Sequence, residues 1–77
     1  MQRYYFDIHD GDRLSWDLEG MECPTPEKMR EEAMAALPSI ASDIHPHGDE
    51  HALSVEVRDD NGRHVFRASL KLTSEWL

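Results

Sequence analysis

The chain has 77 residues and a formal net charge of −8 at pH 7. A domain of this size buries only roughly 60% of the surface that its unfolded chain exposes, so we expect one small domain over residues 1–77. The negative charge argues against the basic stripe of a nucleic-acid-binding protein and against binding to an anionic membrane. We therefore expect neither a nucleic-acid nor a membrane partner.

The cysteine content and the N-terminal residues bear on location. Cys23 is the only cysteine, so no internal disulfide can form, which is typical of a reducing cytoplasm. Residues 1–8 lack the basic and then apolar pattern of a signal peptide. No apolar run approaches the ~18 residues that span a membrane. We expect a cytoplasmic protein.

Residues 3–10 and 12–18 both alternate apolar and polar side chains, the period-two pattern of a strand with one face buried. The alternation predicts two antiparallel strands joined by a tight turn. The apolar members of the two runs are Tyr4, Phe6, Ile8, Leu14, Trp16 and Leu18.

The turn between these runs decides their register. A three-residue loop over residues 9–11 pairs Phe6 with Leu14, so that the apolar side chains share one face, and it gives Gly11 the left-handed position. The same register pairs Asp7 with Arg13 on the opposite face, as a cross-strand ion pair. We predict this register.

A helix follows an extended segment over residues 21–24. Thr25 can cap it, and Pro26 fits the first helical position, where its missing N–H costs nothing. Because Pro38 removes one backbone bond and crowds the preceding turn, we predict a firm helix to about residue 37 and then a kink or a restarted turn. Apolar side chains at spacings of three and four form its buried stripe: Met29, Ala33, Ala36, Leu37, Ile40 and Ile44.

The second hairpin is indicated by Asn61-Gly62 between alternating runs at residues 52–58 and 63–72. A two-residue loop at Asn61-Gly62 places three apolar pairs on one face and the polar pairs on the other. The chain therefore predicts an α+β domain of order β-β-α-β-β, an antiparallel sheet of two hairpins with one helix on one face. The pairs are Val57 with Phe66, Val55 with Ala68, Leu53 with Leu70, Glu56 with Arg67 and Ser54 with Ser69.

Short motifs spread along most of the chain carry a family resemblance. They are Arg3-Tyr4-Tyr5-Phe6, Asp10-Gly11, Asp17-x-Glu19-Gly20-x-Glu22, Arg30-Glu31-Glu32-Ala33, and Val57-Arg58-Asp59 with Gly62-Arg63. In this order the chain resembles a family of short alphaproteobacterial proteins classed as a domain of unknown function. That resemblance implies a cytoplasmic α+β domain and supplies no activity. A looser similarity, through Asp17-Leu18-Glu19-Gly20 and Glu31-Glu32-Ala33, is to the N-terminal domain of HicB-type antitoxins, and it implies a basic protein partner.

The loop over residues 45–51 concentrates three histidines with two carboxylates, which are metal-ligating groups. A structural zinc site draws four ligands from two separated elements, and no second pair is evident. We predict no metal and no cofactor, and we keep small-ligand or metal binding by this loop as the alternative function. Its candidate ligands are His45, His47 and His51.

Neither a nucleophile nor an acid–base pair stands out elsewhere. The paired carboxylates Asp59 and Asp60 lie in a predicted turn, where aspartate is favoured for local hydrogen bonding. Cys23 lies just before the helix, and we expect it to be a buried packing residue. We therefore predict no catalytic residue and no enzymatic activity.

The face of the sheet away from the helix mixes aromatic, acidic and basic side chains, and antiparallel sheets often leave such a face exposed. We expect a small non-enzymatic interaction module that binds a protein or a second copy of itself. The residues that we expect on the binding face are Tyr5, Asp7, His9, Arg13, Glu56, Arg58 and Arg67.

Overall fold

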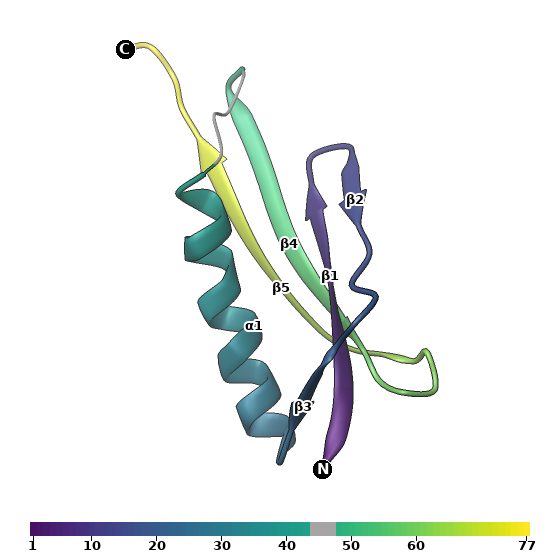
Figure 1. The fold of residues 1–77 in the computed structure, drawn as a ribbon. Coiled ribbons are helices and arrows are strands. Elements are labelled where there is room, and N and C mark those ends of the chain that lie inside the picture. The colour runs from purple at the N-terminus through teal and green to yellow at the C-terminus, as the bar shows by residue number, and fades with distance from the viewer. Residues whose placement is uncertain (44–47) are drawn as a thin grey trace.

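The computed structural model describes residues 1–43 and 48–77. One antiparallel sheet has the strand order β2-β1-β4-β5, and β3 also pairs with β1 (Figure 1). The predicted α+β fold is confirmed, with one additional short strand before the helix. In chain order the elements are β1 (Gln2–Asp10), β2 (Arg13–Ser15), β3 (Met21–Cys23), α1 (Pro26–Ala41), β4 (Glu50–Arg58) and β5 (His64–Thr73).

Two short strands share one edge of β1. β2 pairs with residues 8–10 of β1, and β3 pairs with residues 2–4. Residues 16–20 leave the ladder between them, so the strand that we expected over residues 12–18 shrinks to three residues. The segment that we predicted to lead into the helix in extended conformation does so as β3.

The register predicted for the first hairpin is wrong. Asp10 pairs with Arg13, and His9 pairs with Leu14, so the loop has two residues, Gly11-Asp12. Gly11 has a φ of 60°, and no residue other than glycine has a positive φ in the described part of the chain. A positive φ at the first loop residue alone is the type II′ pattern, which suits a two-residue hairpin and explains why Gly11 stands there.

This register changes which side chains are buried. Leu14 lies opposite His9 on the face away from α1, and the exposed fractions of Leu14, Trp16 and Leu18 are 40%, 58% and 86%. Arg13 lies opposite Asp10, on the face that carries α1. The predicted Asp7–Arg13 pair therefore does not form.

The register of the second hairpin is confirmed by all five predicted pairs, among them Val57 with Phe66. Its turn differs, because Gly62 N donates to Asp59 O (3.0 Å) and Gly62 takes a φ of 82°. The loop therefore has three residues, 60–62, with glycine in the left-handed position. A bulge that leaves Val65 unpaired between Arg58–His64 and Val57–Phe66 restores the predicted register.

The helix begins as predicted. Thr25 is extended (φ −142°), and its Oγ1 accepts a hydrogen bond from Lys28 N (3.1 Å). The helix does not stop and restart after residue 37, because α1 continues through Pro38 to Ala41. Pro38 is exposed, so the turn that loses a backbone bond can be hydrated at little cost.

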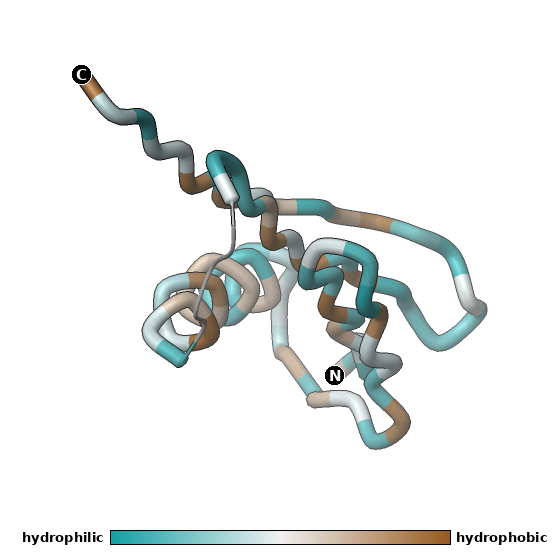
Figure 2. Tube along the Cα trace, turned by 90° about the horizontal axis from the view of Figure 1, so that it is seen from above, coloured by the Kyte–Doolittle hydropathy of each residue, from teal (hydrophilic) through white to brown (hydrophobic). Residues whose placement is uncertain are grey.

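The core lies between α1 and one face of the sheet. Ala33, Val55 and Val57 are fully buried there, as the predicted helix stripe and strand faces require. Figure 2, seen from above, shows the helix as a separate layer beside the strands. The buried hydrophobic residues are Tyr4, Cys23, Met29, Ala33, Leu37, Leu53, Val55 and Val57. Ile44 of the predicted stripe lies outside the described residues.

The molecule is elongated, with extents of 50 × 21 × 18 Å. Within residues 1–43 and 48–77, no helix has the length and apolar character needed to cross a membrane.

Candidate interaction surfaces

Six of the seven residues that we expected on the binding face do lie together on the side of the sheet opposite α1. The register places Tyr5 opposite Arg58, and Asp7 opposite Glu56. His9 and Arg67 extend the same face on β1 and β5. Arg13 is the exception, because it faces the other side. Whether this face binds a partner stays a prediction.

Asp7 and Arg58 form an ion pair in which the carboxylate is buried and the Arg58 side chain is 22% exposed. Asp7 is 1% exposed, and its carboxylate accepts from Arg58 Nε (2.6 Å), Arg58 Nη2 (3.1 Å) and the backbone N of Asp17 (3.0 Å). The hydrogen bonds to Asp7 raise the pKa of Arg58. The guanidinium carbon lies 5.1 Å from the ring centroid of Tyr5 and 5.3 Å from that of Trp16, within cation–π range. Both charges are therefore committed to the fold.

Glu56 is similarly occupied at the centre of this face. Its carboxylate lies 3.4 Å from His9 Nε2, 2.8 Å from His64 Nδ1 and 3.2 Å from Arg67 Nη2. The hydrogen bond from Arg67 contributes most to lowering the pKa of Glu56, against the opposing effect of desolvation. The polar groups of this face thus neutralise one another, which leaves little for a partner to pair with.

The β1 edge of the sheet is held together by Asp17. The Gly11 N to Ala52 O bond (3.1 Å) makes residues 11 and 52 a hydrogen-bonded pair, so by alternation the N–H of Phe6 points away from β4. That N–H lies at the gap between β2 and β3, and it donates to Asp17 Oδ2 (3.0 Å). Asp17 Oδ1 accepts from the backbone N of Glu19 and Gly20.

The environment of Asp17 keeps it ionised. Burial raises the pKa of its carboxyl, but the backbone bonds from Phe6, Gly20 and Glu19, with the charge of Arg58, outweigh burial and lower the pKa. The side chain thus replaces the missing strand partner of Phe6. The Asp-x-x-Gly pattern at residues 17–20 is a turn signal that the sequence did contain.

The opposite edge of the sheet is β5, which within the described residues pairs with β4 alone. Ser74 N donates to Asp49 O (2.8 Å), and hydrogen-bonded pairs alternate along an antiparallel ladder. Even-numbered residues of β5 therefore direct their backbone groups to β4. Arg67, Ser69 and Lys71 direct theirs away from the sheet, where they can pair with another strand.

The charged side chains of β5 are turned back onto β4. Arg67 Nη2 lies 3.2 Å from Glu56, and Lys71 Nζ lies 2.8 Å from Glu50. Leu70 and Leu72, on the face that carries α1, are 43% and 54% exposed. Lysine and arginine on an edge strand commonly prevent pairing with another chain. Here Arg67 and Lys71 form ion pairs with the neighbouring strand β4 instead.

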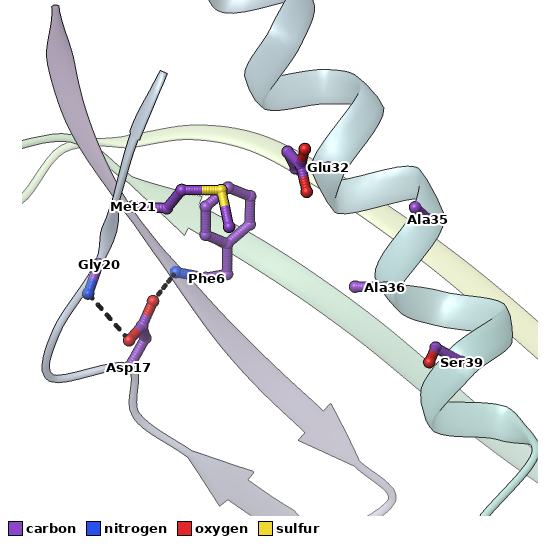
Figure 3. A pocket seen from close by; sticks show the side chains of 8 residues that line it. All are labelled: Phe6, Asp17, Gly20, Met21, Glu32, Ala35, Ala36 and Ser39. Atoms are coloured by element: carbon purple, nitrogen blue, oxygen red, sulfur yellow. Dashed lines mark hydrogen bonds between the residues drawn. The ribbon is translucent and has the colours of Figure 1, made fainter.

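A groove of about 410 Å³ lies between α1 and the β1–β3 side of the sheet (Figure 3). Phe6 and Met21 form its strand wall, and Ala35 and Ala36 its helix wall. Glu32 and Asp17 stand among its polar lining residues.

Of the three predicted metal candidates, His51 alone lies in the described part of the chain. The described residues include no group of three or more His, Cys, Asp or Glu side chains able to hold a metal ion. His51 Nε2 lies 2.6 Å from Asp10 Oδ1, and His45 and His47 lie outside the described residues. Cys23 is 1% exposed, and burial raises the pKa of its thiol.

The chain matches the family model of a domain of unknown function, DUF6894, over residues 3–71. It belongs to this family. The match confirms the resemblance to a domain of unknown function and gives no support to the likeness to HicB-type antitoxins. No curated protein matches the chain, and no solved structure does.

Proposed function

We propose that this DUF6894 domain is a non-enzymatic cytoplasmic interaction module that self-associates by pairing β5 with β5 of a second copy. The open edge of β5 supports this proposal most strongly, because it is ten residues long and its outward backbone groups have no partner among the described residues. The lone, buried thiol of Cys23 is compatible with the proposed cytoplasmic location.

The side chains of β5 favour one antiparallel self-pairing. A register centred on Ala68 sets Arg67 opposite Ser69, and Phe66 opposite Leu70, so that faces match and no like charges oppose each other. Centring on Ser69 would set Arg67 opposite Lys71, which is unfavourable. A register centred on Leu70 also avoids that clash but overlaps over fewer residues. A two-fold axis at Ala68 closes the assembly at a dimer.

The main test uses the direction of one backbone group. Ser69 directs its N–H away from β4, so Ser69→Pro removes a donor from the open edge without removing a bond of the β4–β5 ladder. Analytical ultracentrifugation should find the parent protein and Ser69→Ala as concentration-dependent dimers, and Ser69→Pro as a monomer with unchanged circular dichroism. A parent chain that stays monomeric, or a Ser69→Pro dimer, would overturn the proposal.

The register is tested by disulfide trapping. A cysteine at the two-fold axis faces its own copy at a Cβ separation of about 4.5–5.5 Å, close enough to oxidise after small adjustments. Ala68→Cys should therefore form a covalent dimer under mild oxidation, whereas Leu70→Cys should not. The reverse result would place the axis at Leu70, and crosslinking of neither would contradict β5 pairing.

A further inference from the structure

The sheet is wider than the helix that covers it. Strands lie about 4.8 Å apart and a helix is about 10 Å across, so one helix covers about two strands. α1 packs on β4 and β5, and meets β3 near its N-terminal end. Phe6 and Ile8, on β1, stay only partly buried on the face that carries α1. In the described structure, the β1 side of this face is thus only partly covered by α1.

The flank of α1 that borders the β1 side suits close helix packing. Glu32, Ala35, Ala36 and Ser39 recur at spacings of three and four along it, and two of them are alanines (Figure 3). Small side chains on such a ridge allow another helix to approach at about 8 Å between axes. The strand wall supplies Phe6 and Met21. The Met21 side chain is 42% exposed.

The polar groups of the groove fit a small molecule poorly. Ligand pockets have convergent polar groups that orient their occupant. Here the carboxylate of Asp17 is taken by three backbone N–H groups, and Glu32 already contacts Lys28 Nζ (3.4 Å). An apolar surface with acidic residues at its rim remains.

The charge distribution indicates the polarity of the occupant. The chain as a whole carries a formal net charge of −8 at pH 7. The lining residues include Asp17 and Glu32 but no basic side chain. A helix with an excess of lysine or arginine beside its apolar stripe complements this charge, whereas α1 of a second copy, with three glutamates against one lysine and one arginine, does not.

We propose that the groove between α1 and the β1–β3 side of the sheet binds an amphipathic, basic helix of a partner protein. The helix completes the second layer over β1, with its apolar stripe on Phe6, Met21 and Ala35. This site is separate from the β5 edge, so a dimer formed through β5 would present two such grooves.

The probe is a Leu/Lys peptide of about 18 residues, five helical turns, with leucine at spacings of three and four. Two control peptides are a scrambled peptide of the same composition and a Leu/Glu peptide of the same length. In titrations followed by ¹H–¹⁵N spectra, the Leu/Lys helix should bind and shift Phe6, Met21 and Ala36. The scrambled and acidic peptides should bind at least about tenfold more weakly.

Two charge-matched variants separate docking from general attraction. Ala35→Lys places a cation in the groove, while Met34→Lys makes the same change on the opposite flank of α1. Ala35→Lys should weaken binding about tenfold or more, and Met34→Lys less than about twofold. Ser39→Lys serves as a second groove variant if Ala35→Lys fails to fold.

Equal weakening by both lysine variants, or shifts confined to β5, would overturn the groove proposal. So would a change in the sedimentation of the peptide-free protein caused by Ala35→Lys alone, because it would mean that a second copy fills the groove. Ser69→Pro should bind the peptide as the parent does, so that failure of self-association and failure of the groove can be told apart.

Discussion

The two edges of this sheet solve the same physical problem in opposite ways. At the β1 edge, β2 and β3 leave a gap, and Asp17 accepts the one N–H that this gap would leave without a partner. At the β5 edge, the strand is long and regular beyond Val65, and alternate backbone groups point away from the sheet. One edge is closed by the chain itself, and the other is open to another chain.

The difference separates residues that stabilise from residues that bind. Asp7 and Arg58 are an acid and a base on an exposed face, yet they pair with each other beside Trp16, and Asp7 also accepts from the backbone N of Asp17 at the closed edge. The side chains of β5 look ordinary, but their backbone is the available surface. Buried polar groups with all their bonds formed stabilise the fold, whereas unpaired backbone groups at an edge invite a partner.

The largest effect should come from breaking the closed edge at Arg58. Arg58→Ala takes two hydrogen bonds and the opposite charge from the buried carboxylate of Asp7, so it should lower the unfolding free energy well beyond the loss caused by the same change at Arg67. Arg67→Ala, on the same face but exposed, should cost less than about 1 kcal/mol. Urea denaturation measures both, and equal losses would show that the two edges do not differ as described.

The second hairpin was predictable because its apolar alternation continues on both sides of the turn. The loop was predicted one residue too short, and the bulge at Val65 compensated for that error, so the five predicted pairs survived. A hydrophobic face determines register more strongly than turn type does, because a one-residue slip would bury every polar side chain instead.

The first hairpin was not predictable by the same reasoning. Leu14 and Trp16 alternate as core residues do, but they lie on the opposite face, with Trp16 over Arg58. Periodicity alone does not distinguish an apolar side chain in the core from one that covers an ion pair. The open edge was equally hidden, because strand order depends on contacts between segments far apart in the chain.

Glycine substitutions compare a crowded turn with an open one. Gly20 (φ +74°) would place a Cβ 2.9 Å from the carbonyl oxygen of Tyr4, whereas Gly62 (φ +82°) has nothing within 4 Å of that position. Gly62→Ala should cost about 1 to 2 kcal/mol for its left-handed backbone. Gly20→Ala should cost roughly 2 to 4 kcal/mol, because the contact with backbone adds to that penalty. Thermal or urea unfolding checks the difference, and equal losses would mean that residue 20 can relax.

Removing the charge of Asp17 should have a smaller but local effect. In Asp17→Asn the side chain keeps one oxygen, so it cannot accept from both Phe6 N and Gly20 N as the two carboxylate oxygens do. We expect this to lower the unfolding free energy by about 1 to 3 kcal/mol. Amide exchange should accelerate at Phe6 more than at the neighbouring strand positions. Glu19→Gln, an exposed change in the same turn, is the control. Unchanged protection at Phe6 would show that Asp17 does not close this edge.

Acid should destabilise the fold at both edges of the sheet. Substitutions of Asp17 and Glu56 measure how much of the loss comes from each edge. Asp17 and Glu56 have pKa values lowered by folding, so each deprotonated carboxylate stabilises the fold above its unfolded pKa of about 4. That stability is lost as the pH falls through the lowered folded values. Unfolding free energy should therefore be flat near neutral pH on account of these two groups, and should decline below about pH 5.

Each substitution should reduce the loss of unfolding free energy on acidification by the amount that the removed carboxylate contributes. Asp17→Asn removes the part that belongs to the closed edge, and Glu56→Gln removes the part that ties Arg67 of β5 to β4. Urea titrations between about pH 3 and pH 6 measure both slopes. If neither slope changes, these two carboxylates are not bound more strongly in the folded state. A change in Asp17→Asn alone would mean that the tie between β4 and β5 contributes little, which would leave the side chains of the open edge more mobile than those of the closed one.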